Sequence, residues 1–414
     1  MSTVRPAPEQ CVILVGGLGT RLGSLTQDLP KPLVKVGGKP FLWYLLWHAK
    51  RHGFRRILLL AGHRAARVAE LAPALGHEHG LTIEVVVEPE PLGTGGALRN
   101  ALDRLDDRFI LMNGDSLLDV NWLAMLGLGE QAADAEVGMI LRHQKDASRF
   151  GAVDLEGCKV TGFRERGSAA GGLINGGIYL IQRRIVEALP IRCSLERDVL
   201  PQLAANGQVA GIVQDGYFID IGVPESLERA QTEVPASLPR PAVFFDRDGV
   251  LNRDHGYVHR FADFDWMDGA IDAVRLVNER GWFAFVVTNQ AGVAHGYYDE
   301  TAIAELHGAV SATLRAAGAH LDDIRYCPYH PEAKIDRYRL AHGWRKPAPG
   351  MLLDLAGHWP IDMGRSFIVA DRQTDIAAGQ AAGIDGILYE TGRLDDLIRR
   401  KILAAAMPPM GAQA

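Results

Sequence analysis

A short apolar segment that runs straight into glycine constrains the fold of this chain more than any other stretch. Residues 11–15, CVILV, are apolar throughout, and Gly16, Gly17 and Gly19 follow almost at once. Such a run is typical of a buried strand, and glycines after a strand let backbone N–H groups turn toward a bound phosphate. The spacing fits neither the P-loop nor the GxGxxG pattern, which excludes both of those sites.

Two cations follow the glycines. Arg21 comes directly after the loop, and Lys31 stands between Pro30 and Pro32, which stiffen the backbone around it. A glycine loop with two fixed cations suits a triphosphate, which carries several negative charges. The alternative is a glycine-rich turn with solvated cations, which a lone Gly-Gly pair would favour.

Strands and helices alternate after this loop. Apolar runs at 56–61, 82–88 and 109–113 predict strands, and periodic segments at 42–52 and 64–75 predict helices. This alternation predicts an α/β fold with a doubly wound sheet, whose ligands bind at the carboxyl ends of the strands. Asp115 follows one of these strands, and a carboxylate near a triphosphate suggests Mg²⁺ coordination. Asp220 ends a further predicted strand at 217–221.

Five further motifs strengthen this interpretation: PLGTGGAL at 91–98, NGD at 113–115, FRER at 163–166, INGGIY at 174–179 and YFIDIGVPE at 217–225. With the glycine loop, they make residues 10–232 resemble the sugar-1-phosphate nucleotidyltransferases, most closely the heptose-1-phosphate guanylyltransferases. The resemblance implies a Rossmann-like domain in which a sugar 1-phosphate attacks the α-phosphate of a nucleoside triphosphate. Pyrophosphate leaves, and positioning, Arg21, Lys31 and Mg²⁺ would offset the developing charge.

The same resemblance implies roles for the residues that match its motifs. It implies that Asp115 and Asp220 bind the metal. Arg166 stands at a position where lysine is more common in the family. Glu196 and Asp198 are interpreted as structural. The implied nucleotide-binding residues are Gly16, Gly17, Gly19, Thr20, Gly93 and Thr94, and the implied sugar-phosphate-binding residues are Glu165, Arg166, Asn175 and Gly176.

Glu88 ends the strand before the second glycine turn. Its carboxylate could accept from the N1–H and N2–H groups of guanine, whereas the edge of adenine mixes a donor with an acceptor. A solvated glutamate at a strand end fits the sequence equally well. The choice between GTP and ATP therefore stays open on this residue, and the family match favours GTP.

The length of 414 residues exceeds one ordinary core and predicts two domains, at 10–234 and 241–395. Between them, Gln231–Pro241 has three prolines and no periodicity, which predicts a short linker. A net charge of −6 argues against non-specific nucleic-acid binding, and no apolar run is long enough for a membrane anchor. Four scattered cysteines fit free thiols in a reducing cytoplasm. Nothing in the sequence indicates the oligomeric state.

The second half again places carboxylates after strands. The apolar run 242–245 ends in DRDGVLN, which puts Asp246 and Asp248 two residues apart at a strand exit. One carboxylate could attack phosphorus, and the other could protonate the leaving oxygen and later activate water. Runs at 285–288 and 367–370 predict two more strands, followed by polar side chains at Thr288, Asn289, Asp371 and Asp375.

Together with Lys346 in RKPAPGM, these strand ends resemble the haloacid-dehalogenase-type phosphohydrolases. HGYVH at 255–259 and CPYHPE at 327–332 extend the resemblance, over residues 242–392, to the heptose-1,7-bisphosphate 7-phosphatases, with histidinol phosphatases as the competitor. The resemblance implies that Asp246 is the nucleophile and Asp248 the general acid and base. Its other implied roles are Mg²⁺ binding by Asp246, Asp371 and the backbone carbonyl of Asp248, phosphoryl binding by Thr288, Asn289 and Lys346, orientation by Asp375 and distal-phosphate contact by Arg345.

One loop departs from these relatives. The resemblance to the heptose bisphosphatases implies a structural zinc in the loop at 327–344, because many members of that family hold one there. The matching positions in this chain are Cys327, Tyr329, His342 and Trp344. Tyrosine and tryptophan are poor zinc ligands, so the sequence predicts no zinc. It predicts instead that aromatic side chains pack the loop in place.

The two halves make chemical sense together, because the product of the second is the substrate of the first. The sequence predicts a bifunctional, Mg²⁺-dependent cytoplasmic enzyme of nucleotide-activated heptose synthesis. Its second half would remove the 7-phosphate of D-glycero-D-manno-heptose 1,7-bisphosphate, and its first half would transfer GMP from GTP to heptose 1-phosphate. The alternatives are a hexose-1-phosphate nucleotidyltransferase fused to a histidinol-phosphatase-like or other sugar phosphatase, or one half that serves only as a scaffold.

Overall fold

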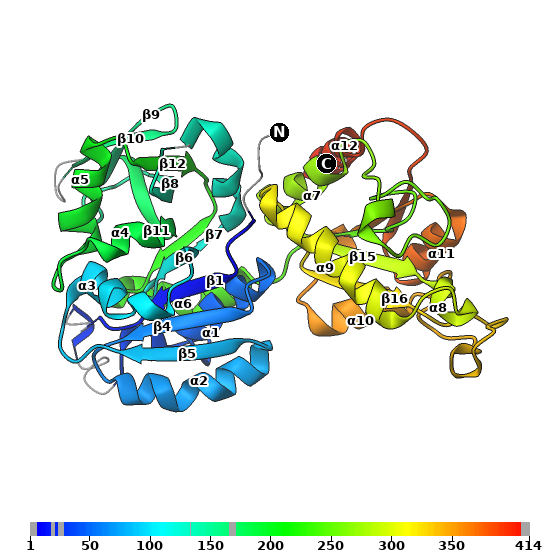
Figure 1. Ribbon diagram of the computed structural model, residues 1–414, viewed down its shortest axis with the longest axis horizontal. Coiled ribbons are helices and arrows are strands. Elements are labelled where there is room, and N and C mark those ends of the chain that lie inside the picture. Colours follow the sequence, from blue (N-terminus) through cyan, green and yellow to red (C-terminus); the bar gives the residue numbers. More distant parts are fainter. Residues whose placement is uncertain (1–5, 18–20, 24–28, 133, 165–170, 407–414) are drawn as a thin grey trace, which may run out of the picture. The chain divides into compact units, whose positions relative to one another are not determined.

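The computed structural model describes residues 6–17, 21–23, 29–132, 134–164 and 171–406. They form two compact units, Pro6–Ser237 and a second that begins at Leu238 (Figure 1). Both units are α/β, as the sequence predicts, with a large mixed sheet in the first and a parallel sheet in the second. None of the helices in the described ranges has both the length and the apolar character needed to cross a membrane.

The first unit is built on a nine-stranded sheet with the order β5-β4-β1-β6-β11-β8-β12-β10-β9. β1 pairs in parallel with β4 on one side and with β6 on the other, so the chain order reverses between β1 and β6. A reversal of this kind leaves a crevice at the carboxyl ends of the strands. The strands are β1 (Gln10–Leu14), β4 (Arg56–Ala61), β5 (Thr82–Val87), β6 (Arg108–Asn113), β8 (Val137–Gln144), β9 (Ala152–Glu156), β10 (Lys159–Arg164), β11 (Gly172–Gln182) and β12 (Val209–Val213).

The apolar run that opens the chain becomes the centre of this sheet. Cys11, Val12 and Ile13 of β1 are inaccessible to solvent, which explains why the run does not alternate with polar residues. Two small sheets pair β2 (Lys35–Val36) with β3 (Lys39–Pro40) and β7 (Ser116–Asp119) with β13 (Tyr217–Asp220). The helices are α1 (Phe41–Arg51), α2 (Ala65–His79), α3 (Gly93–Asn100), α4 (Arg183–Glu187), α5 (Leu200–Ala205) and α6 (Pro224–Ala236).

The predicted linker is wrong over half its length, because α6 continues through residues 231–236. Leu227, Ala230 and Val234 are buried along one face of this helix. The side chain of Gln231 anchors it further, accepting from Gly37 N–H at 3.0 Å and donating to the Lys35 carbonyl at 2.9 Å. Pro235 lies in the last turn, so only the end of the helix loses a backbone hydrogen bond, and its presence misled the sequence analysis.

The second unit has a five-stranded parallel sheet with the order β16-β15-β14-β17-β18. β14 pairs with β15 and β17, so here too the order reverses beside the first strand. The strands are β14 (Ala242–Phe245), β15 (Phe283–Asn289), β16 (Asp323–Cys327), β17 (Phe367–Ala370) and β18 (Asp385–Leu388). The helices are α7 (Ala270–Glu279), α8 (Ala291–His295), α9 (Glu300–Ala316), α10 (Gly350–His358), α11 (Gln373–Ala381) and α12 (Leu394–Ala406).

Alternate side chains of this sheet face opposite layers of helices. Val243 and Phe245 belong to a core cluster that includes residues of α7, α9 and α12. Phe244 points the other way and stacks on Phe285, whose ring lies 5.7 Å from that of Trp359, just after α10. Burial on both faces makes this a doubly wound sheet, as predicted.

Candidate active sites

In the first unit, two carboxylates meet at the pairing of β7 with β13. Ser116 lies opposite Asp220 in this pair, and the N–H of Ile221 donates to the carbonyl of Asp115 at 2.9 Å. Lys31 Nζ lies 2.9 Å from Oδ2 of Asp115. Burial, followed by the charge of Asp115, raises the pKa of Asp220. Two facing carboxylates are a donor set that a hard divalent cation such as Mg²⁺ fits.

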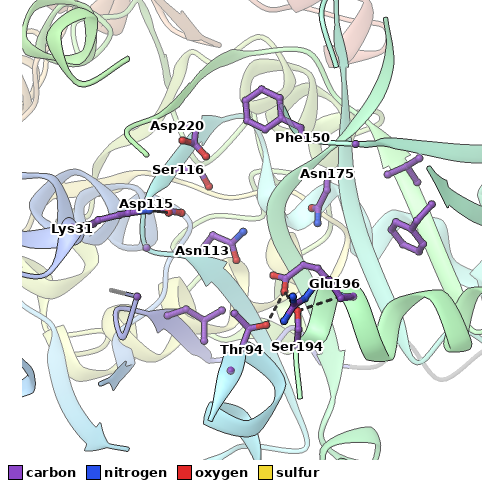
Figure 2. A pocket seen from close by; sticks show the side chains of 18 of the residues that line it. Lys31, Thr94, Asn113, Asp115, Ser116, Phe150, Asn175, Ser194, Glu196 and Asp220 are labelled. Carbon is purple, nitrogen blue, oxygen red and sulfur yellow. Dashed lines mark hydrogen bonds and ion pairs between the residues drawn. The ribbon is translucent and has the colours of Figure 1, made fainter. Parts of the chain in front are cut away.

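These carboxylates form one wall of a cavity of about 1090 Å³ at the reversal between β1 and β6. Figure 2 shows Lys31, Asp115 and Asp220 on one side, Thr94, Ser194 and Glu196 on another, and Asn113 between them. Sites for small molecules commonly measure about 300–1,000 Å³, so this cavity lies just above the upper end of that range. The lining also includes Gly17, Arg21, Gly93, Phe150, Asn175 and Arg197.

The second wall depends on the glycines at the start of α3. Gly93 has φ +80°, and a Cβ there would lie 2.5 Å from the carbonyl oxygen of Cys193. This close approach brings the Thr94 hydroxyl to the segment that follows Cys193. There the hydroxyl accepts from Leu195 N–H at 2.8 Å and donates to Oε2 of Glu196 at 2.7 Å. Glu196, interpreted from sequence as structural, therefore presents its carboxylate in the cavity wall.

The remaining predicted residues of this unit take varied positions. Asn175 lines the cavity and donates to the Tyr179 hydroxyl at 2.6 Å. Gly176 is buried, and a Cβ there would lie 2.5 Å from Leu118, so its role in the structure is close packing. Among the residues called from sequence, Gly16, Glu88 and Gly176 lie outside the described lining. Gly19, Thr20, Glu165 and Arg166 lie outside the described residues.

Glu88 lies against the first glycine loop. Its Oε2 accepts from Leu92 N–H at 3.0 Å, and a Cβ added to Gly16 would lie 2.6 Å from its Oε1. Burial raises the pKa of this carboxyl. The sequence left a solvated glutamate at the strand end as an alternative. In the structure Glu88 is instead partly buried and held next to the glycine loop.

In the second unit, two aspartates at neighbouring strand ends converge with a third in the first turn of α11. Ligand oxygens of Asp246, Asp371 and Asp375 all lie within 4.8 Å of one another. Asp371 Oδ1 and Asp375 Oδ2 are buried and have no hydrogen-bond partner among the described residues. Unpaired carboxylate oxygens facing one point are what Mg²⁺ requires, so this triad is consistent with a Mg²⁺ site. Sequence reasoning gave Asp375 an orienting role and did not place it in this cluster.

Lys346 holds the cluster together. Its Nζ lies 2.9 Å from Asp246 Oδ1 and 3.1 Å from Asp375 Oδ1, and it also donates to the Val287 carbonyl at 2.9 Å. Burial raises the pKa of Asp246 to about 6, although the charge of Lys346 works in the opposite direction. Asn289 fixes the lysine backbone, donating to its carbonyl at 3.2 Å and accepting from its N–H at 3.1 Å.

Asp248 lies beside this cluster with partners of its own. Its carboxylate accepts from Arg247, Asn252 and Gln290, and Gln290 also donates to the Thr288 hydroxyl at 2.9 Å. Gly249 has φ +82°, and a Cβ there would lie 2.2 Å from Asp371 Oδ2. Glycine is therefore required after Asp248 for the two strand ends to approach. Arg345 is half-buried and donates to the Tyr329 carbonyl at 3.4 Å.

The loop at 327–344, where the sequence predicts aromatic packing in place of zinc, packs on itself. The ring of Tyr329 stacks on His342 at 4.4 Å and contacts Tyr338 at 5.9 Å. The hydroxyls of Tyr326 and Tyr338 both donate to Glu300, at 2.7 and 2.6 Å. These contacts provide the packing that the sequence predicts for this loop.

Zinc removal should therefore leave the second unit intact. We expect protein treated with a zinc-selective chelator and returned to Mg²⁺ to keep its melting temperature and its phosphatase activity. Cys327 is buried, so Cys327→Ser should lower the stability of the unit only by the cost of burying a hydroxyl in place of a thiol. Near-stoichiometric zinc in elemental analysis of untagged protein, lost in Cys327→Ser, would contradict this.

Comparison with known proteins agrees with this geometry. The nucleotidyl transferase family model matches residues 10–237, more than half of the 414 residues. The chain belongs to the nucleotidyl transferase family. Over 229 residues it is 34% identical to D-glycero-α-D-manno-heptose 1-phosphate guanylyltransferase from Aneurinibacillus thermoaerophilus, covering 54% of this chain and 98% of that protein. A crystal structure of HddC from Yersinia pseudotuberculosis is 34% identical, covers 54% of this chain and 99% of that chain, and has a TM-score of 0.49.

Beyond this nucleotidyltransferase unit, a HAD-hydrolase-like family model matches residues 343–407. Over 169 residues the chain is 44% identical to D-glycero-β-D-manno-heptose-1,7-bisphosphate 7-phosphatase from Rhodopseudomonas palustris, covering 41% of this chain and 94% of that protein. The second unit therefore belongs to the HAD-like phosphatases. The chain joins two families, as the sequence predicts, and we refer to its parts as the nucleotidyltransferase unit and the phosphatase unit.

Proposed function

We propose that this chain is a bifunctional enzyme that converts D-glycero-D-manno-heptose 1,7-bisphosphate and GTP to a GDP-heptose. One observation carries the proposal: each unit places a group of carboxylates and a lysine at the point where its strand order reverses. Both units are similar over nearly the full length of relatives named for heptose phosphates. A GDP-heptose of this kind would serve surface polysaccharide synthesis.

In the phosphatase unit, Asp246 would attack the 7-phosphate while the bond from phosphorus to the sugar oxygen breaks. That oxygen would take a proton from Asp248, giving heptose 1-phosphate and an aspartyl-phosphate. A water molecule would then attack phosphorus and give a proton to Asp248 while the bond from phosphorus to the Asp246 oxygen breaks, which releases inorganic phosphate and restores the Asp246 carboxylate. Lys346, Thr288 and Asn289 would hold the phosphoryl group, and Mg²⁺ held by Asp246, Asp371 and Asp375 would supply charge stabilisation.

In the nucleotidyltransferase unit, an oxygen of the sugar 1-phosphate would attack the α-phosphate of GTP, and pyrophosphate would leave. Arg21 and Lys31 would neutralise charge on the triphosphate, and we assign Mg²⁺ to Asp115 and Asp220. Glu196 and Asn175 face the same cavity and offer acceptors and donors for sugar hydroxyls. Because all four cysteines are free thiols, we place the enzyme in the cytoplasm; nucleic acid is not a proposed partner.

The two units must act on the same anomer of the sugar. The phosphatase relative is named for a β-configured bisphosphate and the guanylyltransferase relative for an α-configured 1-phosphate, its sugar substrate. Hydrolysis at C7 leaves C1 untouched, so the two units share one pathway only if they act on the same anomer. Because the guanylyltransferase relative is named for the α 1-phosphate, and its unit makes the final product, we propose the α anomer for both. Phosphorus NMR of each bisphosphate anomer with the enzyme alone tests this: the 7-phosphate signal of the α anomer should disappear while its 1-phosphate remains. Hydrolysis of the β anomer alone would contradict it.

The nucleotidyltransferase unit should prefer GTP. An adenine in a site built for guanine leaves buried polar groups unpaired, which costs about 1–3 kcal/mol, or roughly tenfold to a hundredfold in kcat/KM. Glu88→Gln should reduce this preference, because a carboxylate accepts two bonds that an amide does not match. Glu84→Gln, an exposed position on β5, is the matched control. Equal or better turnover with ATP by the unmodified enzyme would refute the assignment.

A further inference from the structure

Arg247, between the two reactive aspartates, is buried in a way that arginine rarely is. Its side chain is 1% exposed. Nε and Nη2 donate to Asp248 Oδ1 at 3.2 and 2.9 Å, and Nη2 also donates to Oδ2 at 2.9 Å. The guanidinium thus spans both oxygens of the carboxylate, an arrangement that fixes its plane as well as its place.

The guanidinium also contacts two other parts of the unit, the backbone at Val258 and the side chain of His307. Nη2 donates to the Val258 carbonyl at 2.6 Å, and Nη1 lies 3.4 Å from Nε2 of His307 on α9. Burial, with the charge of Arg247 adding to it, lowers the pKa of His307 to about 3. The imidazole is therefore neutral near pH 7, and its Nε2 can accept from the guanidinium without repelling it.

The remaining capacity of Asp248 is met by neutral donors. Asn252 Nδ2 donates to Oδ1 at 3.0 Å, and Gln290 Nε2 donates to Oδ2 at 3.0 Å. Gln290 is itself held by the Tyr298 hydroxyl, at 2.9 Å. Arg247 supplies the charged part of this network. Its backbone N–H also donates to Asp246 Oδ1 at 2.7 Å, so one residue contacts both aspartates.

We propose that Arg247 is the positioning residue for Asp248, holding its carboxylate where the leaving sugar oxygen must receive a proton. This rests on the proposed phosphatase function. A side chain that rotates freely is in place for only part of the time, and misplacement of about 1 Å can cost a hundredfold in rate. If Arg247 only stabilised the fold, its loss would lower the rate with every substrate by the same factor. The two roles can therefore be distinguished by comparing substrates.

The test compares two phosphate esters that differ in their need for an acid. A sugar alkoxide needs a proton to leave, whereas p-nitrophenolate leaves without one. The ratio kcat/KM reports the steps through departure of the first product, so it isolates protonation from later hydrolysis. Arg247→Met should lower kcat/KM about a hundredfold for the heptose bisphosphate and less than about tenfold for p-nitrophenyl phosphate.

Two further variants make the comparison decisive. Arg247→Lys keeps the charge but not the fork, so it should fold and show an intermediate, substrate-dependent loss. Arg325→Met removes another ion-paired arginine, on β16, which contacts Asp323 and Asp354 and should affect both esters equally. Equal losses for both esters in a folded Arg247→Lys or Arg247→Met, or no loss, would overturn the proposal. Failure of the unmodified enzyme to release the 7-phosphate would instead refute the phosphatase function itself.

Discussion

Asp246→Asn should abolish phosphatase activity and leave nucleotidyl transfer unchanged. The asparagine keeps the shape of the side chain but cannot form the acyl phosphate, so kcat for release of the 7-phosphate should fall at least about a thousandfold. Asp246 lies in the second compact unit, and its contacts are with Lys346, Asp375 and Arg247 of that unit. The variant should therefore still form a GDP-heptose from heptose 1-phosphate and GTP. Pyrophosphate release with that substrate is the measurement.

Asp263→Asn is the matched control for this variant. Asp263 is in the same unit and pairs on the surface with Arg260 at 2.7 Å. Surface pairs of this kind contribute about 0–1 kcal/mol, so both activities should stay close to those of the unmodified enzyme. Loss of nucleotidyl transfer in a correctly folded Asp246→Asn would mean that the two sites are not independent.

Asp115→Asn should produce the opposite pattern. It removes one carboxylate of the pair assigned to Mg²⁺ and the partner of Lys31. A catalytic metal supplies several kcal/mol of charge stabilisation, so GDP-heptose formation should fall on the order of a hundredfold to a thousandfold. Release of the 7-phosphate should be unchanged, as measured by phosphate production from the bisphosphate alone.

Excess Mg²⁺ adds a second readout to this variant, because part of the lost activity should return as the weakened site fills. Asp106→Asn, which affects a surface pair with Arg56 at 2.9 Å, is the control. Full nucleotidyl transfer by Asp115→Asn at limiting Mg²⁺ would remove Asp115 from the proposed metal site.

The sequence predicts the carboxyl ends of the strands well, because the signals there are local. The apolar runs of β1 and β14 end in glycine or aspartate, and the pairing of each strand follows from the alternation of helices and strands. The strand ends that carry Asp246 and Asp371 therefore fall together as expected. In the other unit, Asp115 and Asp220 meet only because β7 and β13 form a separate small sheet.

Roles that depend on side-chain burial were harder to predict. Glu196 was interpreted from sequence as structural, and it faces the cavity because glycines at the start of α3 let its segment approach. Arg247 stands in the DRDGVLN motif, yet nothing local shows that its guanidinium folds back onto the next residue. Pro235 suggested a linker, whereas buried side chains at 227, 230 and 234 extend α6 past it.

A single-vessel assay tests the central claim most directly. The purified enzyme is given the α anomer of the heptose 1,7-bisphosphate, GTP and Mg²⁺, and products are identified by mass spectrometry and phosphorus NMR. The account predicts one GDP-heptose without a 7-phosphate, together with one inorganic phosphate and one pyrophosphate for each heptose consumed. A nucleotide-sugar that retains its 7-phosphate, or heptose 1-phosphate that accumulates while GTP stays intact, would contradict it.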